Sequence, residues 1–202
     1  MTFTGLWSWE KCGESIKSLR GRLGFPDEPY LNFLGLSLSL EDGLIYDNLK
    51  KQEYPHEYLA WETVYCILYA YSKAKPVPET SRLVTSKQLQ GGQFCTVAVQ
   101  RAKSVIIKTF KEKPEMLIDS AKLLGGFPIN FHYGDYSVRI NALPLIPILV
   151  VFTKEDMEFP ASVDILFDES IKHYLSLEEV GLLAELVASR LKDAFEVLDK
   201  TV

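Results

Sequence analysis

The sequence contains few of the residues that build disulfide frameworks and metal sites. Among its 202 residues there are 3 cysteines and 3 histidines. Cys12, Cys66 and Cys95 are odd in number, lie far apart and form no C-x-x-C pair, which argues against a disulfide framework, a zinc site or an iron–sulfur cluster held by this chain alone. The histidines show neither H-x-x-x-H nor H-E-x-x-H spacing. We therefore expect neither a metal site nor a cofactor.

Long apolar runs and processing signals are also missing. A membrane helix needs about 20 apolar residues, and the most apolar stretch, residues 145–152, is far shorter. The first residues have no apolar run behind a basic start, so they do not form a secretory signal. No Ser/Gly/Pro-rich linker or charge block divides the chain. We expect a cytoplasmic protein without membrane contact, folded as one domain over residues 1–202.

The short motifs of nucleotide binding and hydrolysis are absent as well. The sequence has no G-x-x-x-x-G-K-[ST], no G-x-G-x-x-G, no G-x-S-x-G and no catalytic Cys/His signature. Its net charge of -5 disfavours nucleic-acid binding, because neutralising phosphates requires a basic surface. No reaction can therefore be assigned from a motif.

Three consecutive segments carry the clearest structural pattern in the chain. Residues 137–142 alternate between apolar and polar side chains, residues 145–152 are apolar throughout, and residues 163–168 alternate again. Alternation indicates a strand with one covered face, and a continuous apolar run indicates a strand inside the sheet. The short connections favour an antiparallel meander, with Pro144 and Pro147 at the entrance of the middle strand.

Helical periodicity covers most of the remaining chain. The final helix, residues 176–198, begins with an S-x-x-E capping box, carries a long amphipathic stripe and should lie across the sheet. The fold class is predicted to be α+β, with an antiparallel sheet of an N-terminal hairpin and the C-terminal meander, packed with about five helices. The other predicted elements are helices over residues 7–23, 57–73, 94–110 and 114–124, and a hairpin over residues 30–46.

Polar residues at the ends of the strands form one candidate active site. Asp135, Tyr136 and Arg139 lie at the start of the first strand of the meander, and Asp168 and His173 follow its last strand. If these strand ends meet at one pocket, the carboxylates and the histidine supply an acid and a base. The alternative is structural: a solvent-facing turn before the first strand, and a carboxylate that caps a turn after the last.

A glycine pair and a basic stretch form a second candidate site, for an anion. Residues 82–113 contain seven basic residues and one acidic residue, a net charge of about +6 that leaves about -11 for the rest of the chain. Glycines ahead of a helix expose backbone amides to an anion. The alternative is a glycine turn beside a solvated basic helix face. The candidate residues are Gly91, Gly92, Arg101, Lys103 and Lys108.

Six short motifs give the chain a resemblance to a known family. In their order they resemble the uncharacterised family called domain of unknown function 3786, found mostly in anaerobic bacteria and archaea, over residues 55–198. The motifs are Gly91-Gly92 before an aromatic residue, Leu123-Leu124-Gly125-Gly126, Ala142-Leu143-Pro144-x-x-Pro147, Glu158-Phe159-Pro160, Leu166-Phe167-Asp168 and His173-Tyr174-Leu175.

The resemblance implies a metabolic context but no catalytic residue. Some relatives carry a four-cysteine iron–sulfur segment of the kind seen in corrinoid and one-carbon methyl-transfer proteins, whereas this chain has only Cys12 in that region. The family pattern also has a proline where this chain has Gln90. The first hypothesis is a binding or accessory module of anaerobic redox or one-carbon metabolism, which binds a small anionic ligand or a protein partner. An enzyme with the strand-end site and a self-associating structural module, for example a homodimer, are the alternatives.

Overall fold

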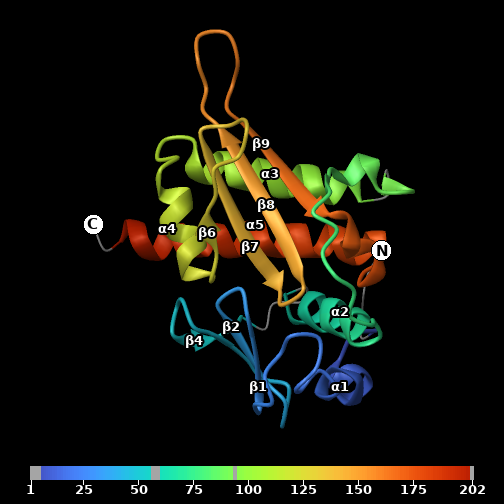
Figure 1. Cartoon of the computed structure of the whole chain (residues 1–202). Coiled ribbons are helices and arrows are strands. Elements are labelled where there is room, and N and C mark those ends of the chain that lie inside the picture. The colour runs from blue at the N-terminus through green and yellow to red at the C-terminus, as the bar shows by residue number, and fades with distance from the viewer. Residues whose placement is uncertain (1–5, 56–59, 93–94, 201–202) are drawn as a thin grey trace.

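The computed structural model describes residues 6–55, 60–92 and 95–200, which form five α-helices and two sheets (Figure 1). The helices are α1 (Trp9–Lys17), α2 (Ala60–Ser72), α3 (Thr96–Phe110), α4 (Met116–Leu123) and α5 (Leu177–Asp199), with short 3₁₀ turns η1 (Ser86–Gln88) and η3 (Glu169–His173). The strands are β1 (Tyr30–Phe33), β2 (Leu36–Ser39), β3 (Ile45–Asp47), β4 (Gln52–Glu53), β5 (Leu83–Val84), β6 (Phe127–Pro128), β7 (Tyr136–Leu143), β8 (Ile146–Thr153) and β9 (Ser162–Asp168).

Both sheets are antiparallel, and they confirm the α+β class. The small sheet has the order β1-β2-β3-β4, and the large sheet has the order β5-β9-β8-β7-β6. The predicted meander is confirmed, because Val138 pairs with Val150 and Val150 pairs with Ile165. The predicted N-terminal hairpin is β2 and β3, but it belongs to the separate small sheet.

The central strand β8 is covered on both faces, as its apolar sequence predicts. On one face, α3 approaches β9 and α4 approaches β7, while α5 crosses behind the sheet and packs most closely against α3 (Figure 1). On the other face, Leu149, Val151 and Leu166 form a small apolar cluster covered by Ile129 and Phe131. Nearly all of the other buried apolar side chains form one continuous core through both sheets.

Two N-terminal elements differ from the sequence prediction. The helix predicted over residues 7–23 ends at Lys17, and the chain then turns through Gly21 and Gly24, whose φ angles are +65° and +83°. The first strand of the predicted hairpin, over residues 30–40, is in fact two strands, because a turn with positive φ at Leu34 and Gly35 folds β1 back onto β2. The expected starts of two helices, at Glu57 and at Phe94, lie outside the described residues.

A buried ion pair joins the small sheet to α5. Arg190 is 0% exposed, and its Nη1 and Nη2 donate to the two carboxylate oxygens of Asp47 at 2.8 and 2.7 Å. Its Nε donates to the backbone oxygen of Leu34 at 3.0 Å. Asp47 also accepts from the backbone N–H groups of Leu49 and Lys50. Burial raises the pKa of Asp47, but the Arg190 hydrogen bonds and charge outweigh it and hold that pKa below its ordinary value.

Candidate functional site

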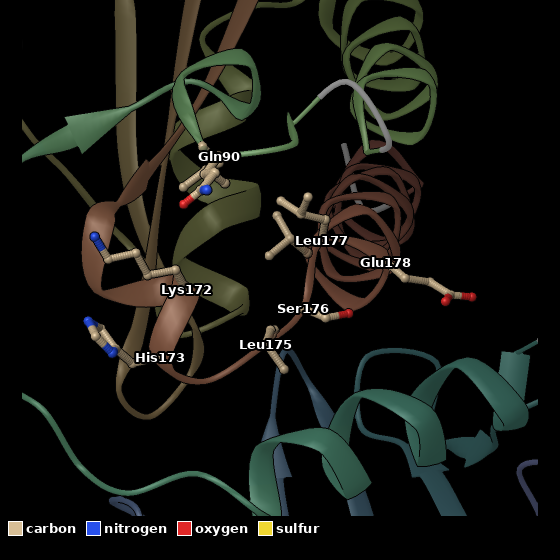
Figure 2. Close-up of a pocket in the computed structure, with 9 residues that line it drawn as sticks. Gln90, Lys172, His173, Leu175, Ser176, Leu177 and Glu178 are labelled. Atoms are coloured by element: carbon tan, nitrogen blue, oxygen red, sulfur yellow. The ribbon is translucent and has the colours of Figure 1, made fainter.

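A pocket of 640 Å³ opens between η3, the start of α5 and the loop that leads into α3 (Figure 2). This volume lies within the ~300–1,000 Å³ of small-molecule sites. We call it the His173 pocket. Its lining residues are Leu89, Gln90, Lys172, His173, Leu175, Ser176, Leu177, Glu178 and Val180.

Local hydrogen bonds fix the two elements that form the walls of the His173 pocket. Asp168 begins η3 by accepting from the backbone N–H of Ser170 at 2.9 Å. The predicted capping box begins α5, because the backbone N–H of Ser176 donates to Glu179 at 2.8 Å. His173 and Ser176 are exposed between these two caps, so the segment presents side chains to the pocket from a fixed backbone.

The pocket has an apolar floor and a polar side. Leu89, Leu175, Leu177 and Val180 supply the aliphatic surface, and Figure 2 shows Gln90, Lys172 and His173 on one side, with Ser176 and Glu178 on the other. The Lys172 ammonium pairs with Glu169 at 3.1 Å in an exposed position. Exposed pairs contribute about 0–1 kcal/mol, so Lys172 can turn toward a ligand at little cost.

A second cavity of 310 Å³ adjoins the first and shares part of its wall. His173 and Lys172 line both cavities, and the second adds Lys73 from the end of α2. Lys73 donates to Ser15 at 2.8 Å and lies over the ring of Tyr69. Lys73, Lys172 and His173 therefore line these adjoining cavities, and the two ammonium groups favour an anion there.

The glycine pair predicted as part of an anion site positions the edge of this pocket. A Cβ atom on Gly92 would lie 1.7 Å from the backbone oxygen of Ser86, so only glycine fits against η1. Gly91 has a φ angle of +78°, a conformation that glycine adopts without strain. The tight turn places Gln90, the residue before the pair, in the wall of the His173 pocket.

The basic residues of the predicted anion site do not gather around the glycine pair. Arg101 lies 3.7 Å from Glu185, and Lys103 lies 2.9 Å from Asp164. Lys108 lines another cavity, between α3 and α5. Carboxylates from distant parts of the chain therefore balance much of the positive charge that the sequence concentrates in residues 82–113.

The register of the large sheet separates the two halves of the predicted strand-end site. Tyr136, which follows Asp135, pairs with Phe152, and Phe152 pairs with Val163. Asp168 lies at the other end of β9, roughly 17 Å along the strand from Val163. The Asp135 end and the Asp168 end therefore do not meet in one pocket, and among the strand-end candidates only His173 lines the pocket described above.

The strand-end residues have structural partners instead. Arg139 pairs with Glu79 at 2.6 Å, and Asp168 accepts from the backbone N–H and the hydroxyl of Thr80 at 3.0 Å. Tyr174 bonds to both backbone groups of Val77. Residues 77–80 therefore form a strap across the outer face of the sheet. Asp168 caps η3, as the structural alternative predicts.

The hydrogen bonds of Asp168 predict a specific pH dependence of stability. Burial raises its pKa, but hydrogen bonds from Ser170 and Thr80 outweigh burial and lower it below the ordinary value. A lowered pKa stabilises the fold above pH ~4 and loses that contribution as pH falls through the folded-state value. We expect Asp168→Ala to cost about 1–3 kcal/mol at pH 7, because the buried N–H of Ser170 and the partly buried N–H of Thr80 lose their acceptor.

Urea unfolding of the Asp168→Ala protein between pH 7 and pH 3 tests this expectation. The difference from the unsubstituted protein should shrink below pH ~4, where the aspartate becomes protonated. Asp168→Asn keeps an acceptor oxygen and should cost less. A difference that stays constant down to pH 3 would contradict the role assigned to the carboxylate.

The thiols and the metal-binding residue types offer no second site in the described part of the chain. Cys12, Cys66 and Cys95 are buried, and burial raises the pKa of Cys66 to about 12. These thiols are therefore protonated and shielded at neutral pH. Within residues 6–55, 60–92 and 95–200, no group of three His, Cys, Asp or Glu side chains is arranged to hold a metal ion. None of the helices in this part of the chain is long and apolar enough to span a bilayer.

Sequence reasoning found His173 but missed the other polar residues of the pocket. Gln90 stands out in the sequence only because the family pattern has a proline there. Lys172 lies in η3, which is too short to give a periodic pattern of side chains. One signal was present: polar residues directly before a capping box lie where loops commonly carry binding residues. The sequence does not show that Gln90 lies in the same pocket as residues 172–178, because tertiary contacts bring these segments together.

The fold and the pocket define an α+β protein of two antiparallel sheets and a long C-terminal helix. Residues 26–190 match the family described as domain of unknown function (DUF3786), which is most of the chain. The chain belongs to this family. No curated protein and no solved structure matches the chain.

Proposed function

We propose that the protein is a binding module whose ligand is a small anion with an aliphatic part, held in the His173 pocket. One observation carries this proposal: three residues with N–H donors, Gln90, Lys172 and His173, line the same pocket as four aliphatic side chains. A carboxylate or a similar group would bind the donors through charge-assisted hydrogen bonds. The aliphatic part would cover the leucines and Val180, each buried CH₂ contributing about 0.8 kcal/mol.

A catalytic role has less support from the same geometry. The His173 imidazole has no carboxylate hydrogen-bond partner among the contacts of the described residues, and the three thiols are buried. A histidine that activates a nucleophile, or is oriented by a carboxylate, needs that partner within hydrogen-bond reach, ~2.6–3.2 Å. A cytoplasmic location and a ligand from anaerobic redox or one-carbon metabolism extend the proposal, and they rest on the sequence and on the family resemblance alone.

Calorimetric titration with octanoate tests the proposal, because octanoate combines a carboxylate with a short aliphatic chain. Octanoate should bind the unsubstituted protein, and Lys172→Ala should weaken binding about 10-fold, the equivalent of one hydrogen bond to a charged group. 1-Octanol has the aliphatic chain without the charge. Its affinity for the unsubstituted protein should be no higher than the affinity of octanoate for the Lys172→Ala variant.

Lys122→Ala is the matched control for this titration. Lys122 forms an exposed ion pair with Asp119 three residues earlier, as Lys172 does with Glu169, but on α4 and outside the pocket. It should leave octanoate binding unchanged. Equal affinities of the unsubstituted protein and the Lys172→Ala variant, or no binding of octanoate at all, would refute the proposal.

A further inference from the structure

The loop between β8 and β9 exposes two large apolar side chains at its tip. Met157 is 104% exposed and Phe159 is 66% exposed. Figure 1 shows this loop extending well beyond the sheet and the helices. Loop tips usually carry small or polar residues. An aromatic and a methionine that contact almost nothing in their own chain therefore point to contact with another molecule.

Hydrogen bonds hold this exposed tip in one conformation. The carboxylate of Asp156 accepts from the backbone N–H groups of Glu158 and Phe159, both at 2.8 Å, and the Asp156 N–H donates to the Phe159 oxygen at 2.9 Å. At the base of the loop, the Lys154 N–H donates to Asp135 at 2.7 Å. Glu155 pairs with Lys111 on the helical side at 3.0 Å. A preorganised tip loses little conformational entropy on binding.

The tip is acidic as well as apolar. Asp156 and Glu158 flank Met157, and no ion pair engages Glu158 among the contacts of the described residues. A complementary surface needs an apolar recess with basic residues at its rim, because opposite charges across an interface favour docking and like charges oppose it.

The chain itself carries a recess of this kind, on the outward side of α3 and α5. A cavity of 300 Å³ there has Val105 and Phe195 as its apolar part, and Lys108, Lys192 and Glu196 also line it. Lys192 pairs with Glu196 at 3.6 Å, which leaves Lys108 as the basic group available to a partner. A second cavity of 270 Å³ continues it, sharing Val105 and Lys192 and adding Arg101 and Glu185, which pair with each other at 3.7 Å. No ion pair engages Lys108 in the part of the chain that the structure describes. We call the two cavities together the α3–α5 groove.

We infer that the β8–β9 tip docks into the α3–α5 groove of a second copy of this chain. Phe159 or Met157 would fill the 300 Å³ recess against Val105 and Phe195, and Glu158 would face Lys108. In this conformation the tip does not occupy the groove of its own molecule, since Met157 is fully exposed. The whole chain carries a net charge of -5, so two copies repel each other generally and need a local match of opposite charge to associate.

Sedimentation velocity over a series of protein concentrations tests this inference. The average mass should rise with concentration, and Phe159→Ala should weaken self-association about 10-fold or more, because a buried aromatic dominates small interfaces. Leu44→Ala, which truncates an exposed apolar residue of the small sheet, should have no effect. The unfolding temperature of the Phe159→Ala protein should be unchanged, since the side chain packs against little in its own chain.

A charge exchange distinguishes the proposed contact from any other association. Glu158→Lys and Lys108→Glu should each weaken self-association, and the two substitutions together in one chain should restore it. Lys87→Glu makes the same charge change at an exposed position outside the groove and should have no effect. A protein that stays monomeric at every concentration, or an association indifferent to Phe159 and Lys108, would overturn the inference.

Discussion

Replacing Arg190 with methionine should lower the free energy of unfolding by about 3–5 kcal/mol, the cost of leaving a buried charge without its partner. The arginine is completely buried, and its bidentate contact with Asp47 is the main polar link between the small sheet and α5. Without it, the Asp47 carboxylate keeps only the N–H groups of Leu49 and Lys50. Urea unfolding at pH 7, followed by circular dichroism, measures this loss.

Arg101→Met supplies the matched control for Arg190→Met. Arg101 makes an ion pair with Glu185, but its side chain is 72% exposed, so its loss should cost less than ~1 kcal/mol. A double substitution, Arg190→Met with Asp47→Leu, should cost less than the sum of the two single substitutions, because neither charge is then left alone. Equal losses of unfolding free energy in Arg190→Met and Arg101→Met would show that the buried ion pair does not hold the small sheet against α5.

Gly92→Ala should destabilise the protein by about 3 kcal/mol, at the upper end of the usual cost of overpacking. The added methyl group would lie 1.7 Å from the backbone oxygen of Ser86, and a backbone atom cannot move aside as a flexible side chain does. The η1 turn must therefore shift, and Gln90 shifts with it. We expect the variant to lose octanoate affinity as well as stability, measured by urea unfolding and by calorimetry.

Gly125→Ala separates this steric effect from backbone strain. Gly125 has a φ angle of +78°, but nothing lies within 4 Å of an added Cβ atom. Its replacement should cost about 1–2 kcal/mol for the left-handed conformation and should leave octanoate binding unchanged. If Gly92→Ala is no more destabilising than Gly125→Ala, the close contact with Ser86 does not determine the shape of the pocket.

The large sheet was predictable because its signal is local. Val138 and Ile165 lie in segments whose alternation of side chains indicates a strand and its covered face, and Val150 lies in a continuous apolar run that indicates a strand covered on both faces. The same rule misled at residues 30–40, because the leucine alternation continues through Leu34 while the chain reverses there. The two-residue edge strands β5 and β6 are too short to carry any period.

The excess of basic residues in residues 82–113 did not predict where free positive charge lies in the folded protein. Lys103 and Asp164 lie 61 positions apart in the chain, yet they form an ion pair. A count of charges along a segment cannot include such partners. The sequence does carry a signal for Arg190, because it lies between Val187 and Leu191, two residues of the apolar stripe of the final helix. An arginine beside such a stripe is a candidate for a buried pair, although its partner Asp47 cannot be named from the sequence.

The most direct test of the proposed ligand site is a nuclear magnetic resonance titration of histidine ring signals with octanoate. His173 lines the pocket, whereas the His132 ring contacts the rings of Phe131 and Tyr133 in the loop before β7. A His173→Gln variant assigns the His173 ring signal. Octanoate should shift the His173 signal saturably and leave the His132 signal in place. A titration that leaves the His173 signal unmoved, or that moves both signals equally, would contradict the account.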